Sequence, residues 1–503
     1  MNFKLRKYIL FSALLLIFFE SVLYLSKKYL YLLSTSIPQI KYDSLNTALI
    51  LLAIIFIIIF FFKKKLYFIF SNFSSGNTKE INYLIISLAI ALVLKFIYID
   101  YLSLVIAPRY IDFPSFFGSV VALKMGLNIY SLKNYLDIFS HIFQEPREIY
   151  PYIYPPFFSV LIYPLSFFNY YSAASLWNFL NLVFLSIGII YTWKFLKPCN
   201  EKKGYFLILL LLIVIINRPI SICIEKGQVD ILVFMLFAFS FYLLKKERTN
   251  LGSLIFAGTI LIKLYTFEYL IYFLLKKEWK ILLKIILMLI FLTLVTLLFS
   301  GYENSLVYIN EILPNFVIGK DANFKFNPFP LIENQSISSI LYKSLYGESN
   351  AVNSFTKIFR LRYLVLIVNL LVWIPLILIF YKNKEDTLNH YEISLVLVAI
   401  FLTSPLLWSH TPIIMIFPYL ILASYILKLE KVDMKLIILS ILSFLLMNTE
   451  IDLKSYSIDF EIKEILFSFL SFRLYSILIL YYIFSNILMK NPAVSRRVSK
   501  IKT

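Results

Sequence analysis

Apolar segments separated by short polar ones follow one another along most of this 503-residue chain. The segments with the length of a bilayer-crossing helix, about 20 residues, are 8–25, 47–62, 81–99, 173–196, 281–299, 362–381 and 464–488. Shorter or interrupted apolar segments lie at 151–168, 205–216, 229–244, 251–275, 391–407, 411–428 and 435–448. The pattern predicts an all-α, multi-pass transmembrane helical protein with about 12 to 14 spans and no soluble domain.

Basic residues beside these segments predict the orientation of the chain. Because Lys and Arg concentrate in short loops next to apolar segments, the net charge of +19 indicates contact with membrane lipid and no nucleic-acid binding. Such loops stay on the cytoplasmic side, so 63–65 is expected inside, and the span 81–99 then places 100–150 on the outer face. The basic loop 197–203 fits this count only if 151–168 is a re-entrant piece. Otherwise that loop is an exception to the rule.

A carboxylate lies in the outer segment, within RYIDFPSFFGSVVALKMGLNIY (109–130). Asp112 followed by Pro114, with Gly126 beyond the apolar residues, is typical of a capped helix over 113–125. The spacing of the apolar residues predicts that this helix is amphipathic and lies in the membrane interface. Capping explains why an Asp is tolerated here. It leaves open a second role, because a carboxylate at the membrane surface can also accept a proton.

A second group of polar residues interrupts the apolar pattern at NRPISICIEKGQVD (217–230). Ionisable groups at membrane depth are costly and usually line a cavity or pair with each other. This segment is therefore either a loop that approaches a polar site or the location of a surface pair between Glu225 and Lys226. Gly227 and Gln228 indicate a tight backbone turn that presents a side-chain amide.

Three further positions also have two interpretations. Lys263 lies where 251–275 is expected to turn between two half-helices, and it either meets an anion or reaches the interface. In ENQSISSIL (333–341), Asn334 or Ser336 caps the start of a helix, or Asn334 contacts a substrate. His410, in the break SPLLWSHTPI (404–413), is either an interfacial residue or part of a site.

Taken together, these residues suit an enzyme that acts on an anionic lipid. Arg and Lys neutralise a phosphate leaving group, and 49 Phe with 37 Tyr can line a groove for a lipid tail. A structural scaffold would leave the outer Asp and its cations unexplained. A transporter would be expected to show internal repeat symmetry, which the sequence lacks. The two cysteines and three histidines offer no disulfide framework and no zinc site.

The order of these motifs resembles that of the GT-C membrane glycosyltransferases and, within them, glycosyltransferase family 87, the polyprenyl-phosphate-mannose-dependent mannosyltransferases. The matching residues are Asp112, Gly126, Tyr130, Tyr152, Tyr154, Pro155, Pro156, Pro164, Pro219, Gly227, Gln228, Val229, Asp230, Gly258, Lys263, Asn334, Gln335, Ser336, Ser404, Pro405, Trp408 and His410. The resemblance covers about 105–425. It departs from the family pattern at Thr411, where members often carry a second His.

The resemblance implies an activity. Members transfer mannose from a polyprenyl phosphate to an acceptor hydroxyl, on a glycolipid or a glycan, at the outer face of the cell membrane. The anomeric carbon is inverted, and no metal or other cofactor is expected. Asp112 would be the general base. The candidates for binding the donor phosphate are Arg109, Lys263 and His410, and those for binding sugar or acceptor groups are Tyr154, Gln228 and Asn334.

The apolar pattern and the extent of the resemblance together predict how the chain is organised. The expected parts are extra N-terminal spans at 1–80, a catalytic core at 81–430 with its outer loop 100–150 and second polar loop 301–360, C-terminal spans at 431–489 and a basic tail at 490–503. The first apolar segment contains Glu20 and no small-residue cleavage site follows it, so we expect a retained span rather than a removed signal peptide. The alternatives are a GT-C transferase for lipid-linked arabinose, galactose or glucose, and a lipid-linked-sugar transporter.

Overall fold

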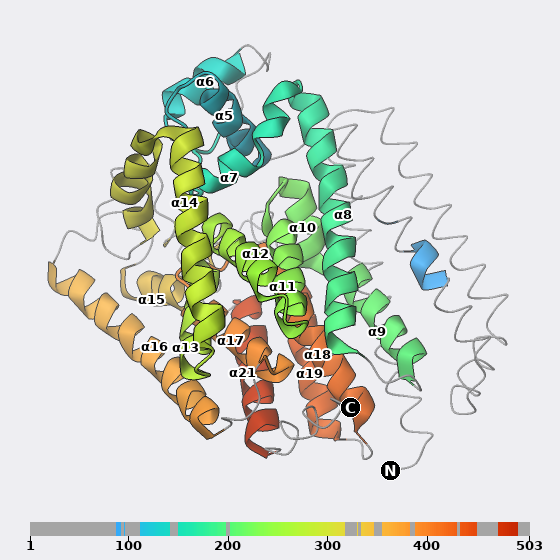
Figure 1. The fold of residues 1–503 in the computed structure, drawn as a ribbon. Coiled ribbons are helices and arrows are strands. Elements are labelled where there is room, and N and C mark those ends of the chain that lie inside the picture. The colour runs from blue at the N-terminus through green and yellow to red at the C-terminus, as the bar shows by residue number, and fades with distance from the viewer. Residues whose placement is uncertain are drawn as a thin grey trace, which may run out of the picture. The chain divides into compact units, whose positions relative to one another are not determined.

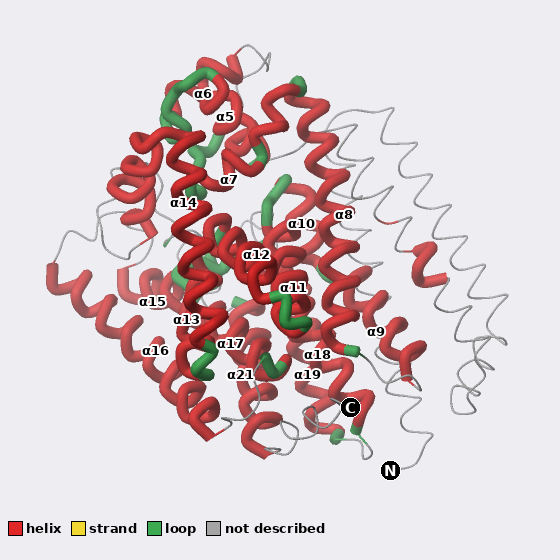
Figure 2. The backbone as a smooth tube through the Cα atoms, in the orientation of Figure 1, coloured by secondary structure: helices red, strands yellow, loops and turns green. Residues whose placement is uncertain are grey.

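The structure of the chain is a computed structural model, and its described elements are all helices (Figure 2). The described residues are 87–91, 95, 111–140, 149–197, 202–316, 329, 333–346, 355–382, 388–429, 433–449 and 471–490. Within them there is no strand, which confirms the all-α class. The predicted spans 8–25 and 47–62, and with them the whole of 1–80, lie outside the described residues, as does Arg109.

Five described helices are long and apolar enough to cross a membrane. They are Tyr170–Leu196, Trp279–Phe316, Phe359–Tyr381, Thr411–Lys428 and Phe472–Met489. The broken pair Gly204–Ile216 and Arg218–Lys226 makes six if it is counted as one span. These helices confirm a multi-pass membrane protein, and the total of 12 to 14 stays a prediction.

The chain divides into two compact units. The first contains α9 (Lys203–Ile216). The second consists of Leu94–Pro198, Asn217–Lys428 and Asp433–Thr503. Asp112, Gln228, Asp230, Lys263 and His410 all belong to this second unit.

In the second unit, some apolar helices are buried by other helices, and others expose apolar side chains at the surface. α11 (Asp230–Lys245) packs against α8 (Tyr170–Leu196) and α12 (Thr249–Ile262), as Figure 1 shows. α17 (His390–Thr403) is buried at every position and packs against α18 (Ile416–Lys428) and α21 (Phe472–Lys490). In contrast, α14 (Trp279–Val307) and α16 (Phe355–Lys382) expose much of their apolar surface. An apolar helix must be covered by protein or by lipid, so the exposed pair has the character of lipid-facing helices.

α5 (Phe113–Lys124) has nearly the predicted bounds, but protein covers most of the helix, including the side expected to be polar and exposed, while its place in the membrane interface stays a prediction. All residues from Phe113 to Val120 are buried. The elements that cover the helix are α6 (Leu132–Ser140), α7 (Pro156–Leu161), η2 (Tyr163–Phe167) and α8. The polar positions can be buried because they are small and satisfied: the Ser115 and Ser119 hydroxyls each donate to a backbone carbonyl 2.8 Å away.

Two segments that the sequence left open are now defined. In 151–168 the helical pieces α7 and η2 are short and separate, which favours a re-entrant piece over a full span. In 251–275 the chain breaks as predicted: α12 ends at Ile262, Lys263 is extended with φ −137° and ψ 112°, and η4 (Leu264–Glu268) and α13 (Tyr269–Leu275) follow.

Candidate active site

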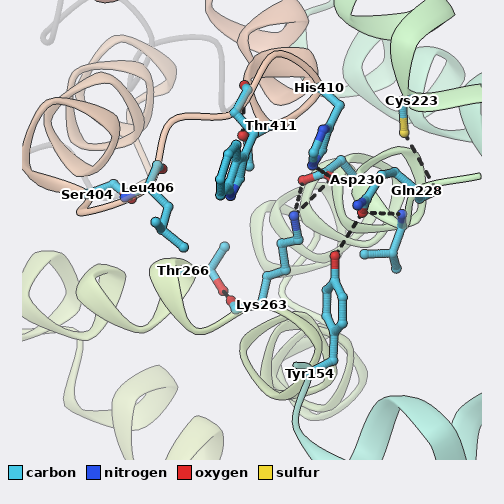
Figure 3. Close-up of polar contacts among 12 residues, drawn as sticks. Tyr154, Cys223, Gln228, Asp230, Lys263, Thr266, Ser404, Leu406, His410 and Thr411 are labelled. Atoms are coloured by element: carbon cyan, nitrogen blue, oxygen red, sulfur yellow. Dashed lines mark hydrogen bonds and ion pairs between the residues drawn. The ribbon is translucent and has the colours of Figure 1, made fainter. Parts of the chain in front are cut away.

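Polar side chains from separate breaks between helices converge on Asp230 (Figure 3). Lys263 comes from the break after α12, and His410 comes from the loop between α17 and η7 (Thr411–Met415). Tyr154 comes from the loop before α7 and reaches Gln228, two residues before Asp230. At a helix break, backbone N–H and C=O groups lack hydrogen-bond partners within the helix. Because several breaks lie close together here, they form a polar site among apolar helices.

Asp112 is anchored to this site by its backbone. Its N–H donates to the Lys226 carbonyl over 3.1 Å, and its carbonyl accepts from the N–H of Ser115. Asp112 occupies the N-cap position of α5, but its side chain makes no capping hydrogen bond, and its φ of −104° and ψ of −28° lie outside the extended region that side-chain caps adopt. The capping interpretation of the carboxylate was therefore wrong, and the side chain is available for other chemistry.

The environment of the half-buried Asp112 carboxyl makes it a better base than a carboxyl in water. Burial raises its pKa above the usual value. The charge of Lys226, a hydrogen bond with the Gln228 side chain and the charge of Lys263 lower the pKa, and the charge of Asp230 raises it again. The net direction is upward, which brings the carboxyl closer to the pKa at which general bases work best.

Gln228 is held at the turn that the sequence predicted. α10 (Arg218–Lys226) ends at Gly227, which has a left-handed φ of 70°. The Gly227 carbonyl accepts from the Trp177 indole over 2.9 Å. The Gln228 Oε1 accepts from the Tyr154 hydroxyl over 2.8 Å. Because Oε1 is the acceptor side of the amide, its Nε2 is left to donate to the Asp112 carboxylate.

Asp230 forms a short, buried ion pair in the site. Its two carboxylate oxygens accept from the Lys263 ammonium at 2.7 and 2.9 Å. Asp230 is fully buried, and the Lys263 side chain is 12% exposed. The sequence predicted that Lys263 binds the donor phosphate, but it did not predict the ion pair of Lys263 with Asp230. Asp230 was noticed only as a motif position and received no role, although its place three residues after Gly227 was the available signal.

The surface pair between Glu225 and Lys226 that the sequence suggested does not form. Glu225 contacts Arg218, not Lys226, at 3.5 Å. Both partners lie on α10, seven residues apart. Lys226 remains beside Asp112, where its charge acts on the carboxylate.

His410 is buried, and its surroundings disfavour the charged imidazolium. Burial lowers its pKa, and the charges of Lys263, Lys226 and Arg473 lower it further. Its Nε2 lies 3.7 Å from an Asp230 oxygen, too far for a hydrogen bond. Within the described residues, its Nδ1 has no hydrogen-bond partner. The described part of the chain contains no group of three His, Cys, Asp or Glu side chains that could hold a metal ion.

The Asn334 side chain forms hydrogen bonds with the backbone of two loops. Its Oδ1 accepts from the N–H groups of Ser336 and Leu407 at 3.1 and 3.0 Å, and its Nδ2 donates to the Pro405 carbonyl over 3.2 Å. Ser336 caps α15 (Ile337–Tyr346) by accepting from the N–H of Ser339 over 3.1 Å. Asn334 thus fixes the loop that leads to His410, and its contact with a sugar stays a prediction.

Comparison with known families identifies the kind of enzyme to which this site belongs. A family model described as glycosyltransferase family 87 matches residues 152–405, more than half of the 503-residue chain. The matched segment contains Tyr154, Gln228, Asp230 and Lys263. The comparison with curated proteins gave no match. The chain belongs to glycosyltransferase family 87 and is a membrane glycosyltransferase.

Proposed function

We propose that the chain transfers a mannosyl residue from polyprenyl phosphate mannose to an acceptor hydroxyl at the outer face of the cell membrane, with Asp112 as the general base. The observation that carries this proposal is the Asp112 carboxyl itself. It is half-buried, it has no capping hydrogen bond, and burial raises its pKa. A carboxylate that is neither neutralised by a direct ion pair nor used by the backbone can take a proton from a substrate.

The proposed reaction is a single displacement. The acceptor oxygen forms a bond to the anomeric carbon while its proton moves to the Asp112 carboxylate. The bond between the anomeric carbon and the phosphate oxygen breaks, and its electron pair leaves with the polyprenyl phosphate. Attack opposite the leaving group inverts the anomeric carbon. Phosphate needs no proton to leave when cations hold it, so one carboxylate is sufficient.

The cations around Asp112 support the donor side of the proposal. Because Lys263 is already paired with Asp230, its charge is balanced inside the protein. Lys226 is half-buried beside Asp112 and forms no ion pair within the described residues, so we assign it to the donor phosphate. His410 contributes a neutral imidazole with an unpartnered Nδ1 to the same side. Arg109, only three residues before Asp112, remains a further candidate.

The experiment compares sugar transfer by the wild type, Asp112→Asn and Asp137→Asn. Asp137 is an exposed carboxylate on α6 and serves as the matched control. With polyprenyl phosphate mannose as donor, loss of the base should lower kcat/KM by roughly 10²- to 10⁴-fold, whereas Asp137→Asn should transfer like the wild type. Nucleotide-linked mannose alone should support no transfer.

Each other outcome contradicts a stated part of the proposal. Normal transfer by folded Asp112→Asn would remove the general base. Transfer from lipid-linked arabinose, galactose or glucose in place of mannose would change the donor. Movement of the lipid-linked sugar across the membrane without a new glycosidic bond would favour a transporter.

A further inference from the structure

We infer that Asp230 is a positioning residue of this enzyme: it holds the Lys263 ammonium in place within the site and balances its charge. The inference rests on the proposed function, in which Asp112 is the general base. The ion pair of Asp230 and Lys263 is inferred to act on that base. Asp230 is not itself placed against the reacting atoms.

The contact between Asp230 and Lys263 has the geometry of a fixed pair. Two short hydrogen bonds, at 2.7 and 2.9 Å, join one ammonium to both carboxylate oxygens. Asp230 is the first residue of α11, where the helix N-terminus favours a negative charge. Lys263 lies in extended backbone between two half-helices and carries a flexible four-carbon stem. The rigid carboxylate therefore determines where the ammonium lies.

Several other groups face the pair. His410 lies 3.7 Å from the carboxylate, and the charge of Asp230 also acts on the buried Tyr154 and Cys223 side chains and on the half-buried Tyr265. Within the described residues, the Tyr265 hydroxyl has no hydrogen-bond partner. None of these groups supplies a second counter-ion for Lys263, since the tyrosines and the thiol are neutral when buried. Asp230 is thus the carboxylate in direct contact with the ammonium.

The pair and Asp112 influence each other in a way that can be measured. The charged groups that act on Asp112 are Lys226, Lys263 and Asp230. Lys263 lowers the pKa of Asp112, and Asp230 raises it. Removing the carboxylate and removing the ammonium should therefore move the titration of Asp112 in opposite directions. A residue that only supports the fold would reduce the amount of folded protein without moving this titration.

The test uses full-length purified protein as wild type, Asp230→Asn, Lys263→Met and the double variant. The pH dependence of kcat/KM gives the protonation of the base. The acid limb should move to lower pH in Asp230→Asn and to higher pH in Lys263→Met. Each single variant should also lose about 100-fold in kcat/KM through misplacement of the remaining partner. The double variant should lose less than the product of the two single losses, because neither charge is then left buried alone.

A second readout needs no sugar transfer. The infrared C=O stretch of protonated Asp112, identified by its absence in Asp112→Asn, follows the same titration. Opposite shifts in this signal, together with no transfer by the wild type or by any variant, would retain the charge-setting role of Asp230 and remove the proposed function. Equal titrations in wild type, Asp230→Asn and Lys263→Met would overturn the inference, whatever the rates.

Discussion

Two buried ion pairs take their lysines from the same segment, α12–η4–α13, and they differ in what surrounds them. Lys263, at the break between α12 and η4, pairs with Asp230. Lys276, at the end of α13, pairs with Glu392 at 2.9 and 3.0 Å, and the two side chains are 1% and 0% exposed. Both carboxylates lie in the first turn of a helix. By geometry and burial the pairs are nearly equivalent.

The neighbours separate the two pairs. Glu392 receives a further hydrogen bond from Tyr272 over 3.4 Å, and the Tyr272 ring packs against Phe380. The pair at Asp230 lies instead beside His410 and acts on Asp112. A buried ion pair therefore indicates only that two charges compensate each other. Titratable groups that are not compensated, close to the pair, are what indicate a catalytic site.

The largest expected effect on folding belongs to the pair at Glu392. Lys276→Met or Glu392→Gln leaves an uncompensated buried charge, which should cost about 3–5 kcal/mol of stability. Thermal unfolding in detergent should show a lower Tm for each single variant and a partial recovery for the double variant. Sugar transfer per folded molecule should keep the wild-type pH dependence. A shifted acid limb here would contradict the distinction between the two pairs.

A smaller effect, on transfer alone, is expected at Lys226. Its charge lowers the pKa of Asp112, so Lys226→Met should raise that pKa and move the acid limb of kcat/KM to higher pH. If Lys226 binds the donor phosphate as proposed, its loss should also cost about 2 kcal/mol of transition-state stabilisation. Lys246→Met is the control, because Lys246 is exposed at the end of α11. Equal rates and equal pH profiles in the two variants would remove Lys226 from the site.

The sequence predicted the features that depend on neighbouring residues. The turn at Gly227 and the break at Lys263 follow from a glycine after a helical segment and from a polar residue inside an apolar one. The bounds of α5 follow from Asp112 with Pro114 and from Gly126. The order of these motifs was also enough to identify the resemblance to glycosyltransferase family 87, which the comparison confirmed.

Features that depend on tertiary contacts could not be predicted in this way. Lys263 and Asp230 are 33 residues apart, and Lys276 and Glu392 are 116 apart, so no local pattern links either lysine to its carboxylate. The burial of α5 was missed for a similar reason. Its serines look polar in sequence, and only the fold shows that their hydroxyls are satisfied by the helix itself.

The smallest effect tests the turn that precedes Asp230. Helix α17, which carries Glu392, begins at an ordinary Asn389 cap, whereas α11 follows Gly227 with its φ of 70°. Gly227→Ala should cost about 1–2 kcal/mol because a side chain disfavours this conformation. It should also lower kcat/KM, since the turn positions Gln228 against both Tyr154 and Asp112.

Gly126→Ala is the matched control for this substitution. Gly126 has a φ of 68°, and a methyl group there would meet nothing within 4 Å. The two variants should lose similar stability in thermal unfolding, and Gly227→Ala alone should lose transfer. Equal losses of transfer would mean that backbone strain anywhere in this region disturbs catalysis. In that case the turn at Gly227 would have no specific effect on the ion pair at Asp230. It would then not distinguish this pair from the one at Glu392.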